Sequence, residues 1–363
     1  MFDVVLQWGF IGPALLIAVG MAILVGGGET LIRGATRLAV AMKIPPVVVG
    51  LTIVAIGTGA PEVAVSLSAV LKGSADMAVG NVVGSNICNI GLILGMAAIL
   101  SPIAVSSTLI RREIPLMIAL SFLMYLLAVF GSKMPMSSLF TGQFEGLIFP
   151  WMGGLLLAGL AACMGWTVYE LRCHKENNEV YAHELETDVL PDAEHPEVKT
   201  QGWKNMSANL GLIVIGVVLL VIGADMMVQG SVQVARLLGV SELIIGLTIL
   251  AVGTSLPELI VTVLAACQGK SDIAIGNVIG SNIFNILGVL GLTALFAGGT
   301  TSGSLQVTAQ ALWFDIPVMI LISLFCIVIC FTGRRVTRGE GGFLLLCYMV
   351  YLIALCVMGG TGT

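Results

Sequence analysis

Charged residues are scarce in this sequence: they make up 10% of its 363 residues, compared with about a quarter of an ordinary soluble domain. Hydrophobic residues make up 57%, and the mean hydropathy is +1.04. The apolar runs are long and continuous rather than alternating, which excludes a membrane β-barrel as well as a soluble domain. The composition therefore predicts an all-α integral membrane protein surrounded by lipid.

Histidine is also scarce, and cysteine follows no recognisable pattern. All three histidines lie in one polar stretch, residues 170–204, which excludes an HExxH zinc site within the membrane. The eight cysteines show neither a metal-ligand spacing nor a disulfide framework, and most lie in apolar runs, where cysteine serves as a small hydrophobe. We expect no enzymatic activity, no resident cofactor, no nucleic-acid partner and no obligate protein partner.

Ten apolar windows of roughly 20 residues are long enough to cross a bilayer as helices. The polar stretch between the fifth and the sixth holds nine of the 21 acidic residues. We read this stretch as a solvated linker, because it lacks the apolar residues needed for a core. The predicted spans are 11–40, 46–71, 77–99, 112–131, 145–169, 206–237, 243–268, 273–297, 309–332 and 342–359.

The lysine and arginine residues predict how these spans are oriented. If the amino terminus is outside, 13 of the 16 basic residues face the cytoplasm, and only Lys72, Lys133 and Arg236 face out. That bias agrees with the positive-inside rule. We therefore expect a multi-pass protein of the cell (inner) membrane, with both termini outside and the acidic linker in the cytoplasm.

An internal repeat organises the chain. Residues 55–95 align without a gap with residues 251–291, at an offset of 196, and about half of the positions are identical. Each copy holds five spans, an odd number, so the copies must cross the membrane in opposite senses, as in many secondary transporters. The predicted organisation is a first five-helix repeat (1–170), an acidic cytoplasmic linker (171–205) and a second, inverted five-helix repeat (206–363).

A glutamate follows a helix-breaking sequence in each repeat. Residues 57–62 read GTGAPE, and residues 253–258 read GTSLPE. Proline removes a backbone donor and glycine tolerates unwinding, so both helices are expected to break near the midplane of the membrane. Carboxylates at that depth are costly, and Glu62 and Glu258 are therefore expected to face each other across a hydrated cavity and share a proton or a metal cation. Two carboxylates with hydroxyls, carbonyls and water are a ligand set that suits calcium.

A second row of polar residues follows in each repeat. The sequences GNVVGSNICNI (80–90) and GNVIGSNIFNI (276–286) place polar side chains four residues apart on one face of an otherwise apolar helix. Their recurrence after both breaks indicates a binding surface rather than simple helix packing. The residues in this row are Asn81, Ser85 and Asn89 in the first repeat, and Asn277, Ser281 and Asn285 in the second.

The doubled GTSxPE and GNxxGSNxxNI blocks resemble the alpha repeats of the cation/calcium antiporter superfamily, and within it the prokaryotic sodium/calcium exchangers. The resemblance covers most of the chain and implies ten helices and exchange of calcium for sodium by alternating access. It makes Glu62 and Glu258 the ligands shared by calcium and sodium, with the carbonyls of Thr58 and Thr254 beside calcium. The further sodium ligands that it implies are Ala55, Ser85, Asn89, Ala251, Ser255, Ser281 and Asn285.

Two positions depart from the pattern of that family. Gly59 stands where the family usually has a serine, so one sodium site is expected to lack a hydroxyl, with space for a water beside the glycine. On this basis, Gly59→Ser is expected to lower the sodium concentration needed for exchange. Asn285 stands where potassium-dependent members carry an aspartate, which argues against potassium co-transport.

Other modes of action stay open or are disfavoured by particular residues. The two coupled glutamates could carry protons, as in a proton/calcium antiporter, although the flanking hydroxyls favour sodium. The same ligands could also line a passive cation channel. An intramembrane protease is disfavoured because the paired centre contains neither aspartate nor histidine, and an anion transporter is disfavoured because the centre carries carboxylates instead of positive groups.

Overall fold

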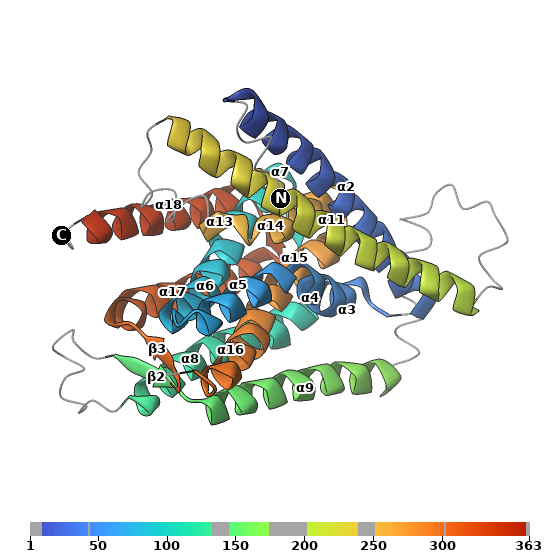
Figure 1. Cartoon of the computed structure of the whole chain (residues 1–363). Helices are drawn as coiled ribbons and strands as arrows, with labels where there is room; N and C mark the ends of the chain where they lie inside the picture. Colours follow the sequence, from blue (N-terminus) through green and yellow to red (C-terminus); the bar gives the residue numbers. More distant parts are fainter. Residues whose placement is uncertain are drawn as a thin grey trace.

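The computed structural model describes residues 9–42, 44–132, 145–173, 202–238, 251–300 and 303–360. These ranges are mainly helical, with two short antiparallel strand pairs (Figure 1). The first half contains α2 (Ile11–Met42), α3 (Pro46–Val49), α4 (Ala55–Thr58), α5 (Ala60–Leu71), α6 (Ala75–Cys88), α7 (Gly95–Leu100), β1 (Ile103–Ala104), α8 (Ile114–Gly131), β2 (Gly146–Ile148) and α9 (Pro150–Cys173). The second half contains α11 (Gly202–Leu237), α13 (Ala251–Gly253), α14 (Leu256–Cys267), α15 (Ser271–Phe284), α16 (Gly291–Ala297), β3 (Leu305–Val307), α17 (Ile316–Gly333), β4 (Arg335–Val336) and α18 (Arg338–Gly360).

The second half repeats the order of elements in the first. α14 begins and ends 196 residues after α5, and α15 begins and ends 196 residues after α6, which is the offset of the sequence repeat. π-helical turns recur in the same way, because the turn Asn89–Leu94 joins α6 to α7 and the turn Asn285–Leu290 joins α15 to α16. Further π-helical turns in the described ranges are Gly50–Val54, Leu109–Glu113 and Ala311–Asp315.

The two halves interlock. Strand β1 pairs with β4 and strand β2 pairs with β3, so each strand pair joins one half to the other. α9 packs against α16 and α18 against α7 in the same crosswise manner. Glycines allow these close contacts: a Cβ added at Gly95 would lie 2.9 Å from the carbonyl oxygen of Gly341, and one at Gly153 would lie 2.6 Å from that of Gly291. The helices between them, α5, α6, α14 and α15, are thereby held at the centre.

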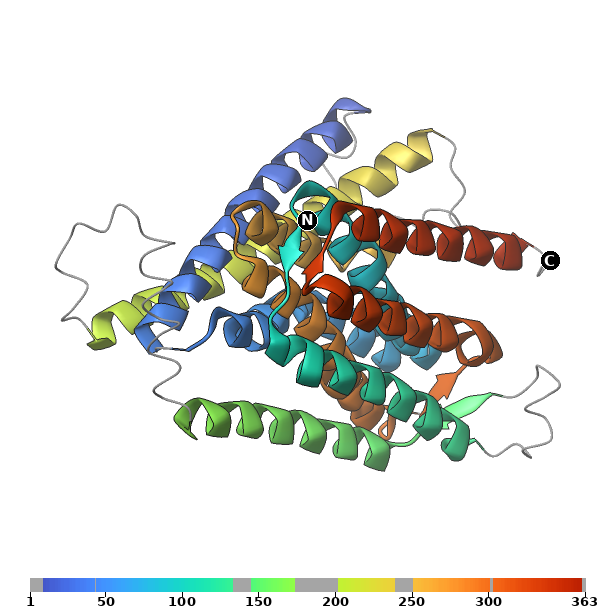
Figure 2. The same ribbon diagram turned by 180° about the vertical axis from the view of Figure 1, so that it is seen from behind.

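The longest helices, α2 and α11, pack side by side along one side of the molecule (Figures 1 and 2). Their contact is a seam of glycines spaced by seven residues, which places them on one face of each helix. A Cβ at Gly20 would lie 2.9 Å from the carbonyl oxygen of Gly223, and a Cβ at Gly27 would lie 2.9 Å from the amide nitrogen of Leu220. Close backbone approach of this kind is how small residues hold helices together in lipid. The seam consists of Gly20, Gly27 and Gly34 in α2, and Gly216, Gly223 and Gly230 in α11.

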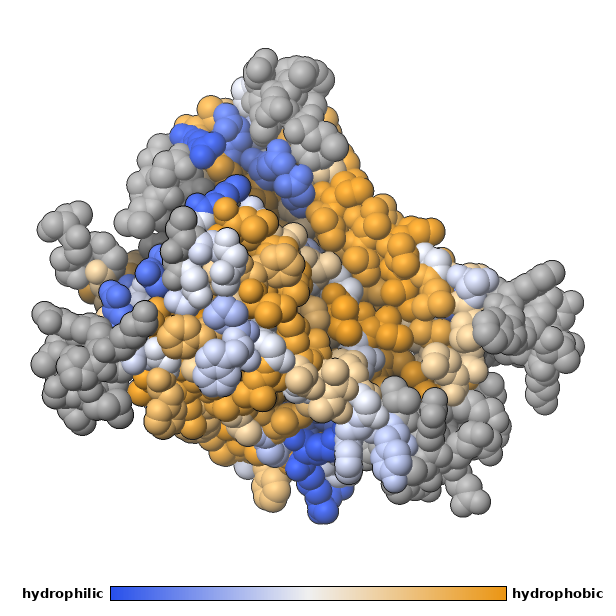
Figure 3. All heavy atoms as spheres, turned by 60° about the horizontal axis from the view of Figure 1, so that its bottom comes forward, coloured by the Kyte–Doolittle hydropathy of each residue, from blue (hydrophilic) through white to orange (hydrophobic). Residues whose placement is uncertain are grey.

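The outer surface carries many large hydrophobic side chains, which is what a protein surrounded by lipid requires. Figure 3 shows a broad hydrophobic surface on one face. Exposed residues such as Val214 in α11, Phe331 in α17 and Ile353 in α18 contribute to the apolar exterior. In a soluble protein, apolar surface of this extent would cause association.

The described ranges contain seven helices that are long and apolar enough to cross a membrane, or eight when the bent pair of Pro46–Thr58 and Ala60–Leu71 counts as one span. The expectation of a mainly helical membrane protein is thus confirmed. The predicted seventh span, 243–268, lies partly outside the described residues, and α14 alone is 12 residues long. The total of ten spans stays a prediction, as does the linker 171–205, most of which lies outside the described residues.

The glycine seam generates a stability prediction. Replacing Gly27 by alanine places a Cβ 2.9 Å from the Leu219 side chain and the Leu220 backbone, and relieving that overlap is expected to cost about 1–3 kcal/mol. Thermal unfolding of the purified protein in detergent measures the loss. Gly26→Ala is the matched control, because Gly26 is exposed and a Cβ there meets no described atom within 4 Å. Equal unfolding temperatures for the two variants would contradict the conclusion that close packing at the glycine seam stabilises the protein.

Candidate cation-binding site

Both predicted helix breaks are present. In the first half, α4 ends at Thr58 and α5 begins at Ala60, and the chain bends by 43° between them. Pro61 lies in the first turn of α5, where its missing N–H has no helical partner to lose. In the second half, α13 ends at Gly253 and α14 begins at Leu256. The sequence prediction of a break before each glutamate is confirmed.

Glu62 and Glu258 lie in the first turns of the helices that follow these breaks. Their side chains are 1% and 2% exposed, and the two carboxylates interact electrostatically with each other. The amino-terminal turn of a helix favours a negative charge, which offsets part of the cost of burial. The Ser255 hydroxyl donates a hydrogen bond of 3.3 Å to Glu62 Oε1, across the boundary between the halves. The structure therefore brings both predicted glutamates into one buried centre.

Buried oxygens without a hydrogen-bond partner gather at this centre. Most buried polar atoms in proteins are hydrogen-bonded, so an unpartnered one needs an explanation. Eight such side-chain atoms occur in the described part of the chain, and all but Ser106 Oγ come from residues that the sequence assigns to the site. The seven are Glu62 Oε2, Glu258 Oε2, Ser85 Oγ, Ser281 Oγ, Asn89 Oδ1, Asn285 Oδ1 and Thr254 Oγ1. Six of them form three pairs related by the 196-residue repeat.

These oxygens suit a hard cation. Carboxylate, hydroxyl and amide oxygens are the ligands of calcium and of similar ions, and a bound cation would satisfy the lone pairs that the protein leaves unpartnered. No three side chains of histidine, cysteine, aspartate and glutamate form a cluster within the described ranges. The negative charge at this centre therefore comes from Glu62 and Glu258, with neutral oxygens around them.

The asparagines Asn89 and Asn285 are oriented by two asparagines that the sequence analysis did not select. Asn89 Nδ2 donates to Asn282 Oδ1 at 2.9 Å, and Asn285 Nδ2 donates to Asn86 Oδ1 at 3.1 Å. Each amide nitrogen is used in this way, and each amide oxygen is left buried without a hydrogen-bond partner. Asn86 and Asn282 fall one position outside the four-residue spacing, but their recurrence at the offset of 196 was a usable signal.

Asn81 and Asn277 hold the broken helices to the helices that follow them. Asn81 Nδ2 donates to Ser66 Oγ at 2.9 Å, and Asn277 Nδ2 donates to Thr262 Oγ1 at 3.0 Å. Each also reaches the backbone carbonyl of the glutamate in its own repeat. In addition, the Thr58 hydroxyl donates to Asn277 Oδ1 at 3.2 Å. These contacts fix the helical turn that carries each glutamate.

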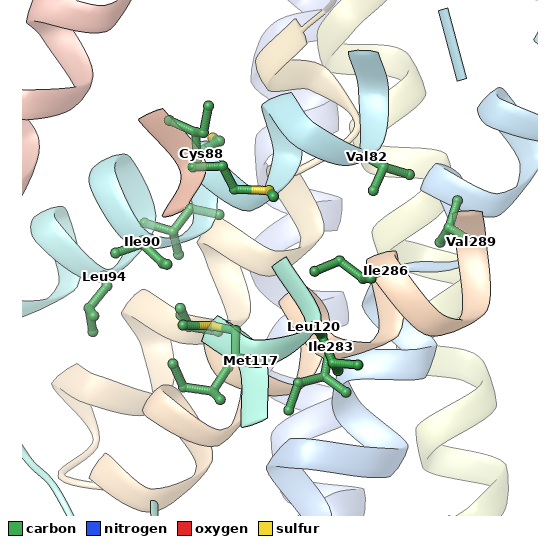
Figure 4. Close-up of a cluster of buried hydrophobic side chains, with 14 of the residues drawn as sticks. Val82, Cys88, Ile90, Leu94, Met117, Leu120, Ile283, Ile286 and Val289 are labelled. Carbon is green, nitrogen blue, oxygen red and sulfur yellow. The ribbon is translucent and has the colours of Figure 1, made fainter. Parts of the chain in front are cut away.

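The remaining predicted ligands lie on or beside the two helix breaks. Ala55 is fully buried, and its carbonyl oxygen accepts a hydrogen bond of 3.0 Å from the Gly59 amide. Ala251 is the first residue of α13, and its side chain lies outside the described part of the chain. Thr58 and Ser255 are buried beside the glutamates. A tightly packed apolar cluster from both halves surrounds this region, and Figure 4 shows Cys88 and Ile90 with Met117, Ile283 and Ile286 in it.

The space beside Gly59 differs from the expectation. A Cβ at this position would lie 3.0 Å from the Ala55 carbonyl oxygen, and 3.0 Å and 3.2 Å from Cδ1 and Cε1 of Phe284, so the phenyl ring takes up part of the space that was expected to admit a water. A serine side chain at position 59 would require the Phe284 ring to shift by a few tenths of an ångström, and the expected effect of Gly59→Ser on sodium stays a prediction. The sequence alone did not reveal this contact, since the two residues are far apart in the chain.

Comparison with known proteins agrees with this geometry. The sequence profile of the family described as "Sodium/calcium exchanger protein" matches residues 12–169 and 208–357. The sodium/calcium exchanger MaX1 of Methanosarcina acetivorans is 35% identical over 350 residues, which cover 94% of this chain and 97% of that protein. The inner membrane protein YrbG of Escherichia coli is 35% identical over 352 residues, which cover 95% and 98%.

The structure is also similar to that of the sodium-calcium exchanger NCX_Mj, with a TM-score of 0.73 and 28% sequence identity. The superposition covers 94% of this chain and 98% of that one. The family profile spans both repeats, and the relatives match over nearly their full lengths. This chain belongs to the sodium/calcium exchanger family of multi-pass membrane transporters.

Proposed function

We propose that this protein exchanges calcium for sodium across the membrane by alternating access, with Glu62 and Glu258 as the binding groups that the two ions share. The observation that carries the proposal is the set of seven unpartnered buried oxygens: two belong to the carboxylates of Glu62 and Glu258, five belong to neutral side chains, and six of the seven recur in both repeats. Calcium and sodium are the transported substrates. We further propose that the protein has no resident cofactor and needs no protein or nucleic-acid partner.

Charge balance at the buried centre explains why transport would be coupled. Two carboxylates without a cation repel each other in surroundings of low dielectric constant, whereas one calcium ion neutralises both. Sodium ions at the same carboxylates would neutralise them in turn, so calcium and sodium exclude each other. A form with only part of its charge compensated is expected to be too costly to pass through the closed intermediate of the cycle.

The ligand roles that we propose are those implied by the family resemblance. We propose that Glu62 and Glu258 bind calcium together with the carbonyl groups of Thr58 and Thr254. The sodium ligands are proposed to be the same glutamates with Ala55, Ala251, Ser85, Ser255, Ser281, Asn89 and Asn285. The unpartnered hydroxyls of Ser85 and Ser281 and the amide oxygens of Asn89 and Asn285 support this assignment.

The architecture proposed for the cycle is a pair of inverted five-helix repeats, 1–170 and 206–363, joined by a cytoplasmic linker, 171–205. Ten spans would place both termini outside the cell (inner) membrane and the broken helices at its midplane. The offset of 196 residues between matching helices and the crosswise packing of the halves support this proposal. Rocking of helices around a fixed central site is the motion such repeats permit.

The first functional prediction concerns the glutamates. Glu62→Gln or Glu258→Gln removes one of two charges that neutralise a divalent cation, so calcium flux in liposomes is expected to fall to the level of protein-free vesicles. Both variants should still fold, because glutamine has the shape of glutamate and retains an oxygen acceptor. Glu340→Gln is the matched control, since Glu340 is only partly buried and accepts hydrogen bonds from Thr337 at the start of α18. Wild-type flux in either central variant would remove these residues from the proposed role.

The second prediction separates sodium coupling from its alternatives. Purified protein in liposomes is expected to accumulate labelled calcium against its gradient when sodium flows outward, because calcium entry uses the energy of sodium exit. Equal potassium or proton gradients are expected to give no comparable accumulation. Accumulation driven by protons alone would identify a proton/calcium antiporter, whereas calcium that only equilibrates under every gradient would identify a passive channel.

A further inference from the structure

The two halves match closely at the cation site, but three corresponding positions exchange small and large side chains. The first set crosses between the halves, because Gly59 lies in the first repeat while Phe284 and Gly288 lie in the second. An offset of 196 residues relates this set to its counterpart. The first set, here called the Gly59 flank, is Gly59, Phe284 and Gly288, and its counterpart, the Ser255 flank, is Ser255, Cys88 and Leu92.

On the Gly59 flank, the ring of Phe284 is seated between two glycines. A Cβ at Gly59 would lie 3.0 and 3.2 Å from Cδ1 and Cε1 at one edge of the ring, and a Cβ at Gly288 would lie 2.7 and 2.8 Å from Cε2 and Cδ2 at the other edge. Both distances to Gly288 are too short for any side chain larger than hydrogen. The ring therefore occupies space that only glycine leaves at position 288, and a side chain at position 59 would require it to shift by a few tenths of an ångström.

The Ser255 flank has polar side-chain atoms at the positions that correspond to Gly59 and Phe284. The Ser255 hydroxyl donates to Glu62 Oε1 at 3.3 Å, and the Cys88 thiol lies beside that hydroxyl. Ser85, one turn before Cys88, and its counterpart Ser281, one turn before Phe284, both have a buried hydroxyl without a partner, so the flanks differ at Ser255 and Cys88 and not at these serines. Where the Gly59 flank has a phenyl ring between two glycines, the Ser255 flank has the hydroxyl of Ser255, the thiol of Cys88 and the side chain of Leu92. The largest side chain of the Ser255 flank, Leu92, therefore lies one turn after the position that corresponds to Phe284.

The two flanks differ in what they can offer a monovalent cation. Hard cations in proteins take oxygen ligands, and neither glycine nor phenylalanine has a side-chain oxygen. The ring turns an edge toward Gly59, and the edge is the positive part of an aromatic quadrupole, so cation–π attraction is not available in that direction. The ring also lies against the position that a Cβ of residue 59 would take, which leaves less room for a water in place of the missing hydroxyl.

We propose that Phe284 is a specificity-determining residue that blocks a monovalent-cation position on the Gly59 flank, so that sodium coupling uses the Ser255 flank. This inference rests on the sodium/calcium exchange proposed above. It assigns a role to Phe284, Gly288 and Cys88, which lie outside the proposed ligand set. The calcium position between Glu62 and Glu258 is unaffected by the asymmetry, because both glutamates and both threonines are present.

Copying the Ser255 flank onto the Gly59 flank tests the proposal. The triple variant Gly59→Ser/Phe284→Cys/Gly288→Leu supplies a hydroxyl and keeps the volume filled. Calcium efflux from liposomes is measured as a function of external sodium. We expect the sodium dependence of the triple variant to be steeper than that of the wild type by about one sodium ion, because the steepness can rise with the number of sites.

The packing part of the proposal has its own readout. Gly59→Ser alone is expected to lower the unfolding temperature, because the serine side chain overlaps the ring of Phe284. Adding Phe284→Cys should recover part of that loss, which is the non-additivity expected of residues in contact. Phe331→Cys is the control for removing a phenyl ring, since Phe331 is 74% exposed on α17. Additive losses for Gly59→Ser and Phe284→Cys would overturn the packing argument.

Calcium-for-calcium exchange without sodium separates this inference from the proposed function. If the wild type lacks that exchange, the proposed function fails. If wild type and triple variant both show it, but their sodium curves have the same steepness, the Phe284 proposal fails. Should the triple variant not fold, Ser255→Ala decides the question: it is expected to flatten the sodium curve, and an unchanged curve would place sodium coupling elsewhere.

Discussion

The structure depends on keeping two carboxylates, Glu62 and Glu258, buried next to each other inside an apolar protein. Each is almost fully removed from solvent, and their charges repel. Such a pair is tolerable only when helix ends, hydrogen-bond donors and cations compensate it. A site that needs cations to be stable, and that two kinds of cation can satisfy, has the energetics that exchange requires.

The surrounding elements serve this pair. The breaks after Thr58 and Gly253 create the helix ends on which the glutamates sit, and the asparagines of α6 and α15 tie those ends in place. The crosswise contacts of α9 with α16 and of α18 with α7 hold the halves together around the centre. The glycine seam of α2 and α11 forms a separate layer along one side (Figure 2). A centre held in place by these contacts, with α2 and α11 packed as a layer beside it, suits a transport cycle in which helices move around a bound ion.

Much of this arrangement follows from the sequence because duplication makes local signals doubly visible. The breaks at GTGAPE and GTSLPE, the burial of Glu62 and Glu258, and the ends of the spans Ile11–Met42, Leu109–Gly131 and Ala311–Gly333 to within a few residues all follow from local composition. Contacts between distant residues do not. The orientation of Asn89 by Asn282 and the filling of the Gly59 space by Phe284 depend on how two helices pack, which no periodicity in one helix specifies. The glycine seam could be predicted only in part. The seven-residue spacing of the glycines is visible in the sequence, but the sequence does not show that α2 and α11 pack against each other.

The central claim is that calcium and sodium compete for one carboxylate pair. Equilibrium binding of labelled calcium to the purified protein, measured at increasing sodium concentrations with the ionic strength held constant by choline chloride, tests it most directly. The account predicts one high-affinity calcium per chain, with an apparent Kd that rises steadily with sodium while the maximum amount bound stays the same, because linkage requires each ion to weaken the other. A calcium Kd that saturating sodium leaves unchanged would contradict a shared site.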